Sequence, residues 1–277
     1  MNLSLCTISF RHHLTSLEDI SNFAVRNQFQ GIELWGAHAK QLAETSGCHM
    51  SMLKEKGLSV SMLSHYLPLH TPYDNVHKAF QSLSNLGRNY ETNKLRIFAG
   101  HCGSGHISRE ERTEIISTLK LLCRHAEEAG QQLLIETHPN TLADSLSSTL
   151  QLLEEVNHDT LKINFDVLHV WEGGAEPAEA ARLLLPCIQH YHFKNIAGRE
   201  QLHVFHPQNV YAPSGSREGM VPLFEGAVDY QGFLYDMLPA VKGTDISLEW
   251  FGADVENVLA NDAKLFHKLS ESVYFNS

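Results

Sequence analysis

Short apolar segments rich in β-branched residues recur along the chain, and longer stretches with a helical pattern separate them. Within Arg109–Gly130, apolar residues recur on one helical face, and Gly130 is placed to end the helix. A second helical stretch is Ser147–Val156. The segments that we expect to form strands are Ser4–Ser9, Gly31–Trp35, Ser59–Tyr66, Lys94–Ala99, Gln132–His138, Leu161–Leu168, Ile188–Asn195 and Asp245–Phe251.

The alternation of eight strands with helices predicts an α/β fold with a parallel sheet, most simply a closed (β/α)8 TIM barrel. An open doubly wound sheet is the alternative, which is disfavoured because no GxGxxG motif follows an early strand. No linker or change of composition interrupts the chain, so residues 1–277 are expected to form one barrel domain. From Ile196 to about Asp229 the sequence is polar and rich in Pro, Gly and Asn, and we expect a long irregular loop that covers the substrate; a mobile loop without a role is the alternative.

Charge and cysteine content narrow the range of partners. The chain has 21 Lys and Arg against 32 Asp and Glu, a formal net charge of −11, which argues against nucleic acid. No apolar run reaches the roughly 18 residues of a membrane span, and the N-terminus does not resemble a signal peptide, so we expect a cytoplasmic protein without a membrane partner. A homodimer is one option for the oligomeric state. The five cysteines are scattered, which argues against disulfides and thiolate zinc sites: Cys6, Cys48, Cys102, Cys123 and Cys187.

Four successive predicted strands finish with an acidic residue or a histidine where apolar residues should fill a barrel. They are Glu136, Asp166, His192 and Glu249. TIM-barrel enzymes carry their chemistry at these strand ends. Three carboxylates and one imidazole cannot share a low-dielectric centre as bare charges, so we predict a divalent metal ion between them. Oxygen and nitrogen ligands without thiolate suit Mn²⁺, Mg²⁺, Co²⁺ or Zn²⁺, and the carboxylate majority favours Mn²⁺ or Mg²⁺, with Mn²⁺ as our first choice.

Strand parity adds weaker candidates to this cluster. Arg96 and Lys194 are predicted to point inward, where either can bind an anionic substrate group; a salt bridge inside the barrel is the alternative for Arg96. Tyr66 ends the third strand and either lines the pocket or simply packs. Phe251 has the parity of the last strand-end glutamate and is a candidate for contact with the substrate. Glu33 also has inward parity, and a site role and a structural role are both open for it.

Several of these segments resemble one known superfamily over nearly the whole chain. The segments are Gly31–Trp35, Glu136–Asn140, Asp166–His169, His192–Asn195 and Glu249–Phe251. They resemble the xylose isomerase-like TIM-barrel superfamily, which includes sugar isomerases, 3-epimerases, inosose dehydratases and endonuclease IV. Within it, a further set is similar to the 3-dehydroshikimate dehydratases of petrobactin siderophore biosynthesis: Ser4–His12, Glu136–Leu142, His190–Asn195 and Gly219–Gly226.

The resemblance to these dehydratases implies a metal-dependent reaction that forms 3,4-dihydroxybenzoate (protocatechuate) from a small carboxylate substrate. It implies that the metal ligands are Glu136, Asp166, His192 and Glu249. The positions that match the family's pocket are Tyr66, Arg96, His138, His169, Lys194 and Tyr211. Our first candidate for the general base is His169 and the second is His138, because an imidazole titrates near neutral pH. A metal-bound glutamate is the third option, and Lys194 is a candidate for assisting proton transfer.

Three other functions remain as alternatives. A sugar or inositol isomerase, epimerase or dehydratase would share the barrel, the metal and the proton abstraction, but would require contacts to hydroxyl groups rather than to a carboxylate. An endonuclease IV-like repair enzyme would require more metal ligands and a basic face, which a net charge of −11 opposes. A sugar- or metal-binding protein without activity would not require the spare acid–base groups. The pathway also stays open, because protocatechuate serves catabolism as well as siderophore synthesis.

Overall fold

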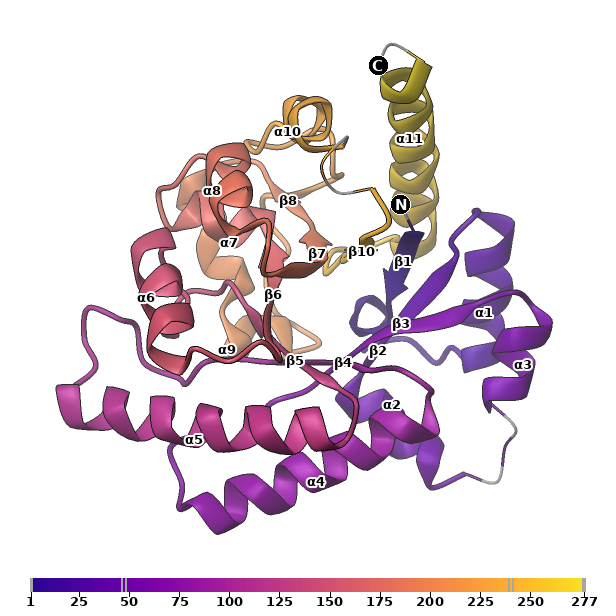
Figure 1. The fold of residues 1–277 in the computed structure, drawn as a ribbon. Helices are drawn as coiled ribbons and strands as arrows, with labels where there is room; N and C mark the ends of the chain where they lie inside the picture. The colour runs from indigo at the N-terminus through magenta and orange to yellow at the C-terminus, as the bar shows by residue number, and fades with distance from the viewer. Residues whose placement is uncertain (1, 46, 48, 239, 241, 276–277) are drawn as a thin grey trace.

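The structure is a computed structural model that describes residues 2–45, 47, 49–238, 240 and 242–275. Eight parallel strands close into a barrel in the order β1-β10-β7-β6-β5-β4-β3-β2, and helices surround them (Figure 1). This architecture confirms the predicted (β/α)8 fold. The barrel strands are β1 (Asn2–Cys6), β2 (Gly31–Trp35), β3 (Ser59–Ser64), β4 (Lys94–Ile97), β5 (Gln132–Glu136), β6 (Leu161–Asp166), β7 (Ile188–Phe193) and β10 (Asp245–Leu248).

Several helices between the strands begin where the sequence supplies a side-chain cap. In α5, Ser108 and Glu111 form a reciprocal capping box at the start, and Gly130 follows the end with φ +67°, a conformation that suits glycine. The α-helices are α1 (Leu17–Arg26), α2 (Gly36–Ala43), α3 (His49–Glu55), α4 (Tyr73–Asn89), α5 (Arg109–Glu128), α6 (Leu146–Val156), α7 (Val167–Glu172), α8 (Pro177–Leu184), α9 (Pro207–Val210), α10 (Tyr230–Met237) and α11 (Val255–Phe275).

The main hydrophobic core lies between the strands and the helices. On β7, the outward-facing rings of Tyr191 and Phe193 pack against Phe233 of α10, with ring centroids 6.2 Å and 5.8 Å from it. The inward-facing residues of the same strand are His190 and His192, both fully buried. The barrel interior is therefore polar, although TIM barrels usually fill it with branched apolar side chains. Such an interior has to be stabilised by specific polar contacts.

Several predicted strand ends are wrong by two or three residues. The first strand was expected at Ser4–Ser9, but β1 stops at Cys6 and a 3-10 helix, η1 (Thr7–Phe10), follows it. The strand predicted as Leu161–Leu168 stops at Asp166, whose side chain accepts a hydrogen bond from the backbone of His169 and so begins α7. A carboxylate that caps a helix ends the extended conformation at its own position. The apolar pattern continues from strand into helix there, so periodicity alone does not show the boundary.

The segment from Ile196 to Asp229 was predicted to be an irregular loop, and that prediction is partly wrong. Two short strands, β8 (Asn195–Ile196) and β9 (Met220–Val221), pair antiparallel, and a 3-10 helix, η2 (Arg199–Phe205), and α9 lie between them. Polar side chains hold this segment together from within. The side chain of Asn209 donates to the carbonyl oxygens of Val204 and Ser216, both at 2.7 Å. Its Asn and Ser content therefore provides internal hydrogen bonds to the backbone rather than disorder.

The described cysteines are all free thiols: Cys6, Cys102, Cys123 and Cys187. Cys48 lies outside the described residues. None of the helices described combines the length and the apolar character that crossing a membrane demands.

Candidate active site

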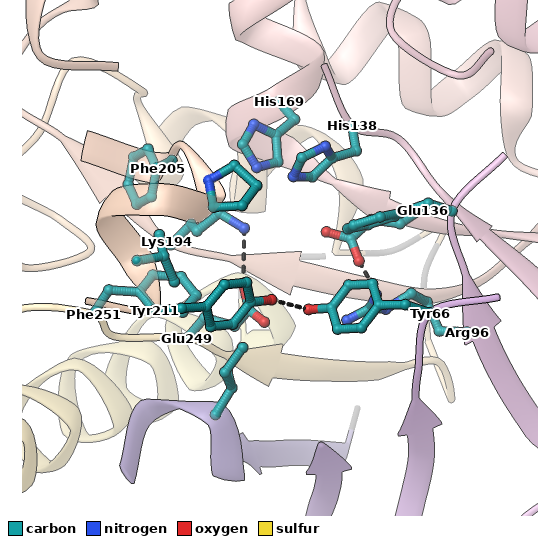
Figure 2. A pocket seen from close by; sticks show the side chains of 14 residues that line it. Tyr66, Arg96, Glu136, His138, His169, Lys194, Phe205, Tyr211, Glu249 and Phe251 are labelled. Carbon is teal, nitrogen blue, oxygen red and sulfur yellow. Dashed lines mark hydrogen bonds and ion pairs between the residues drawn. The ribbon is translucent and has the colours of Figure 1, made fainter. Parts of the chain in front are cut away.

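A cavity of about 250 Å³ opens at the carboxyl ends of the barrel strands. Figure 2 shows its side chains, which come from opposite sides of the barrel and from the segment after β7. TIM-barrel enzymes have their active sites at this end of the barrel. It is lined by Ile8, Tyr66, Arg96, Phe98, Glu136, His138, His169, Lys194, Phe205, Pro207, Val210, Tyr211, Glu249 and Phe251.

The four residues predicted as metal ligands lie together: Glu136 and Glu249 line this cavity, and Asp166 and His192 are fully buried beside them. Glu136 and Asp166 are the last residues of β5 and β6, His192 lies in β7, and Glu249 directly follows β10. The Nδ1 atom of His192 lies 3.6 Å from a Glu136 oxygen, 3.9 Å from an Asp166 oxygen and 3.5 Å from a Glu249 oxygen. At these distances the three carboxylates surround this nitrogen without forming a short hydrogen bond to it. The structure thus brings all four predicted ligands together.

Charge and ligand type make this cluster suitable for a divalent cation. The buried carboxylates outnumber the two permanent cations inside the barrel, Arg96 and Lys194; these carboxylates are Glu33, Glu136, Asp166 and Glu249. His192 Nδ1 is buried and has no hydrogen-bond partner among the described residues. A divalent ion would balance the charge and give this nitrogen a partner. Carboxylate oxygens with one imidazole nitrogen fit Mn²⁺, Mg²⁺, Co²⁺ or Zn²⁺.

Lys194 bridges two of these carboxylates. Its Nζ atom lies 2.5 Å from Asp166 Oδ2 and 2.8 Å from Glu249 Oε2. Burial alone would lower the pKa of this amine, but the charges of Asp166 and Glu249 outweigh burial and raise the pKa well above its usual value. Lys194 is therefore a fixed cation in the cavity wall, and two of its contacts are already used by the protein.

Arg96 enters the cavity from the other side. Its Nε atom lies 2.9 Å from Glu136 Oε2, and its guanidinium lies over the rings of Tyr66 and Phe98, at 5.4 Å and 4.9 Å from their centroids. Burial would raise the pKa of Glu136, but Arg96 lowers it well below the ordinary value. The Nη1 atom of Arg96 has no hydrogen-bond partner among the described residues. Arg96 thus makes the salt bridge that was one of its two expected roles and retains capacity to bind an anion.

Two histidines stand side by side on the cavity wall, with His138 and His169 ring centroids 4.5 Å apart (Figure 2). His138 Nδ1 lies 2.8 Å from the carbonyl oxygen of Pro139, which can only accept, so Nδ1 carries the proton and Nε2 is free to take one. Burial, with a smaller contribution from His169, lowers the pKa of His138 well below its ordinary value. His138 is therefore neutral at physiological pH.

His169 is supported by a carboxylate from its own helix. Its Nδ1 atom lies 2.7 Å from Glu172 Oε2, and its Nε2 atom lies 3.9 Å from Asp166 Oδ2. Burial would raise the pKa of Glu172, but the hydrogen bond to His169 lowers it. Since the ionised carboxylate accepts, His169 donates from Nδ1 and presents Nε2 as the basic nitrogen. Both candidate bases are thus placed in the same cavity.

The segment after β7 forms one wall of the cavity, where the predicted covering loop was expected. Tyr211 stacks on Trp35, with ring centroids 6.0 Å apart and 11° between the planes. Its hydroxyl group shares a hydrogen bond with that of Tyr66 (Figure 2). Arg11 donates from Nε to the carbonyl oxygen of Val210 at 2.8 Å. Contacts from the first three strands and their loops therefore hold this segment over the cavity.

Residues 22–269 match the xylose isomerase-like TIM barrel family. The chain belongs to this family. The match spans most of the sequence and confirms the predicted family.

A curated relative within the family is the 3-dehydroshikimate dehydratase of Bacillus anthracis. It is 46% identical over 273 residues, which cover 96% of this chain and 96% of the relative. A crystal structure of the probable 3-DHS dehydratase AsbF of Bacillus anthracis, involved in petrobactin synthesis, has a TM-score of 0.92 at 45% identity and covers 96% of this chain and 99% of that one. These relatives confirm the predicted resemblance and the prediction of an enzyme of the dehydratase class.

More distant solved structures share the fold alone. The IOLI protein, solved with a zinc atom, has a TM-score of 0.74 at 16% identity and covers 99% of this chain and 98% of its own. A xylose isomerase-like protein of Mycobacterium smegmatis, solved in complex with magnesium, has a TM-score of 0.68 at 18% identity and covers 98% and 97%. Divalent metals thus occur in other barrels of this fold.

Some residues of the site were absent from the sequence-based prediction. Glu172 lies on α7 rather than at a strand end, and only its spacing of three residues from His169 hinted at contact. Phe98 and Phe205 line the cavity, but an aromatic residue near a strand end or in a loop is more often core. Trp35 stacks on the lining residue Tyr211, which is distant in sequence.

Proposed function

We propose that this chain catalyses the metal-dependent dehydration of 3-dehydroshikimate to 3,4-dihydroxybenzoate. The observation that carries the proposal is that one cavity is lined by the His138–His169 pair and by Glu136 and Glu249, two members of the four-residue cluster. This chain is also 46% identical to a 3-dehydroshikimate dehydratase over 96% of its length. Paired acid–base groups beside a cation site suit proton abstraction next to a carbonyl, followed by loss of a hydroxyl group.

The walls of the cavity suit a small, ring-shaped acid. Aromatic faces from Tyr66, Phe98, Phe205 and Phe251 surround it, and such faces fit a ring that becomes planar during the reaction. Arg96 is the cation that we assign to the substrate carboxylate, because Lys194 is already held by Asp166 and Glu249. A polyhydroxylated sugar would require more neutral donors and acceptors than this wall supplies, which places the isomerase and epimerase alternatives second.

We assign Glu136, Asp166, His192 and Glu249 as the residues that would hold the metal, and Mn²⁺ as the metal. When bound, a divalent ion supplies Lewis-acid stabilisation for negative charge that develops on the C3 oxygen of the substrate. Support for the metal comes from the charge balance and the unpartnered nitrogen of His192 described above.

In the proposed reaction, His169 Nε2 removes the proton from C4 of the substrate, and Glu172 stabilises the imidazolium that results. The C5–O bond then breaks while a C4–C5 double bond forms, and the departing hydroxyl group takes a proton and leaves as water. A proton moves from C6 to the C3 oxygen, and the ring becomes aromatic. The aromatic walls exclude bulk water during these steps, and His138, neutral and adjacent, is the second group able to move a proton.

The direct test is to incubate the Mn²⁺-loaded protein with 3-dehydroshikimate and to follow the ultraviolet absorbance of protocatechuate, with the product identified by mass. The chelated protein and a Glu136→Gln variant serve as controls and should form no product above background. An Mn²⁺-loaded wild-type protein that leaves 3-dehydroshikimate unchanged would refute the proposal. Activity on a sugar or inositol instead would establish the second candidate.

We also propose that the product serves siderophore synthesis. Support comes from the Bacillus anthracis structure, whose protein is involved in petrobactin synthesis and overlaps 96% of this chain. Deleting the gene and measuring secreted siderophore in iron-poor medium tests this assignment. Normal siderophore secretion together with loss of growth on a precursor of protocatechuate would assign the enzyme to catabolism.

A further inference from the structure

A second group of polar residues lies inside the barrel, and the proposed chemistry does not use it. Its centre is Glu33 of β2, and its other members are Ser64 of β3, His190 of β7 and Ser247 of β10, all fully buried. Burying a carboxylate is costly unless it is paired and hydrogen-bonded. A glutamate retained at this place therefore needs an explanation from its contacts.

Glu33 contacts the proposed metal ligand His192 directly. Its Oε2 atom lies 2.8 Å from His192 Nε2, and its Oε1 atom accepts a hydrogen bond from the Ser64 hydroxyl group. His190 completes the surroundings, with Nε2 at 3.6 Å from Glu33 Oε2 and at 2.7 Å from the Ser247 hydroxyl oxygen. The carboxylate thus joins strands from different sides of the barrel interior.

This contact determines which nitrogen of His192 faces the site. Glu33 Oε1 accepts from the Ser64 hydroxyl group and Oε2 lies 2.8 Å from His192 Nε2, so both oxygens of this carboxylate act as acceptors. His192 must then donate from Nε2. Its Nδ1 atom is left to face Glu136, Asp166 and Glu249 at 3.5 to 3.9 Å.

The pairing of strands is also irregular beside this residue. The pairing of β2 with β3 shifts register between Ile32 and Glu33, as in a β-bulge. Bulges next to active sites re-aim a side chain away from its regular direction. The extra residue is Ser61 of β3, since Ile32 pairs with Val60 and Glu33 with Met62, and β3 also carries Ser64, which donates to Glu33.

From this geometry, we propose that Glu33 is a positioning residue for the metal centre, fixing the ring orientation and the tautomer of His192 so that Nδ1 faces the ion. The inference rests on the metal site of the proposed function. A carboxylate that accepts from the distal nitrogen of a metal-binding imidazole also makes the near nitrogen a stronger donor. Removing such a partner typically lowers metal affinity by roughly 10- to 100-fold.

The test measures metal affinity without reference to turnover. Metal-free wild type, Glu33→Gln and Glu33→Asp are titrated with Co²⁺, and binding is followed through the visible absorption bands of the ion. Glu33→Gln keeps the shape and removes the charge, whereas Glu33→Asp keeps the charge on a shorter side chain. The matched control is Asp245→Asn, which removes one negative charge from the opposite end of the barrel, where Asp245 pairs with Lys94 at 2.7 Å. Far-ultraviolet circular dichroism of the metal-free proteins monitors the fold.

The expected result is a roughly 10- to 100-fold weaker Co²⁺ affinity and altered absorption bands in Glu33→Gln. Glu33→Asp should fall between Glu33→Gln and wild type, and Asp245→Asn should match wild type. If Glu33→Gln does not fold, the comparison of Glu33→Asp with wild type decides. Wild-type affinity and spectrum in the Glu33 variants would overturn the inference and leave the metal site intact. Absence of Co²⁺ binding by the wild type would overturn the metal site and the inference with it.

Discussion

His169 and Glu172 are joined by a hydrogen bond of 2.7 Å between the imidazole Nδ1 and the carboxylate Oε2. This contact directs the basic Nε2 atom of His169 to the cavity and provides a negative charge behind the ring. It distinguishes His169 from its neighbour His138, whose Nδ1 donates to a neutral carbonyl group instead. An imidazole backed by a carboxylate is the better group to hold a proton during a reaction.

We therefore expect His169→Asn to lower kcat by roughly 10²- to 10⁴-fold with metal binding retained, the usual loss when a positioned base is removed. Glu172→Gln should lower kcat by a smaller factor, because it weakens the base without removing it. The measurements are steady-state kinetics on 3-dehydroshikimate and a metal titration of each variant. His138→Asn is the comparison. If it loses kcat while His169→Asn keeps it, the base is His138, and if both keep it, a metal-bound carboxylate takes the proton.

Arg96→Met should mainly raise KM for 3-dehydroshikimate, by roughly 10-fold or more, with a smaller change in kcat. The reason is that a contact to the substrate carboxylate is made equally in the ground state and the transition state. The matched control is Arg112→Met, because Arg112 forms its ion pair with Glu155 at 2.9 Å on the outer helices. Unchanged KM in Arg96→Met, combined with a raised KM in Lys194→Met, would transfer carboxylate binding to Lys194.

Metal binding should stabilise the fold as well as support activity. Adding Mn²⁺ at about 100 times its dissociation constant should increase the free energy of unfolding by about 2.7 kcal/mol, which thermal unfolding detects as a higher Tm. Chelation should abolish activity, and Mn²⁺ or Co²⁺ should restore it. His192→Ala should show neither the Tm increase nor the activity. If the Tm of the wild type does not rise when Mn²⁺ is added, the result would count against the metal site.

Asp262 gives the stability of the protein a pH dependence of its own. This buried residue of α11 accepts the backbone N–H of Leu223 with both carboxylate oxygens at 3.1 Å, and burial raises its pKa from 3.8 to about 7. The folded state thus binds the proton more tightly than the unfolded chain. The stability that Asp262 contributes is complete below pH 3.8 and is lost as the pH rises to about 7.

The Asp262→Asn variant should therefore become more stable than wild type over this range, with an advantage that grows up to about pH 7 and then stays constant. Thermal unfolding at pH 5.5 and pH 8 measures it. Asp236→Asn is the control, because Asp236 is half exposed in a surface pair with Arg182 and should show no such trend. Equal pH trends in wild type and Asp262→Asn would show that the carboxyl group does not titrate in this range.

Strand parity explains why part of the site could be predicted from the sequence. Glu136 and His138 are two residues apart on one strand end, so they face the same way, and the same holds for His192 and Lys194. The order of parallel strands then brings these ends to one rim without any knowledge of loop conformation. For these residues, strand parity and barrel closure are sufficient to predict that their side chains meet at the site.

Contacts between distant segments could not be predicted in this way. Tyr66 and Tyr211 share a hydrogen bond although 145 residues separate them, and the conformation that permits it depends on the internal hydrogen bonds of the segment after β7. The pairing of Lys194 with Asp166 and Glu249 was missed for a related reason. Parity shows that a side chain points inward, but it does not show which of several inward charges it meets.

Side-chain alternation along β7 places the residues that pack the core and the residues of the polar interior on opposite faces of the same strand. Tyr191 and Phe193 pack outward against Phe233, while His190 and His192 meet other polar groups inside. Directed evolution can exploit this division: libraries restricted to inward positions sample new substrates without spending the apolar packing that keeps the chain folded. Libraries restricted to outward positions adjust heat tolerance while the chemistry stays as it is.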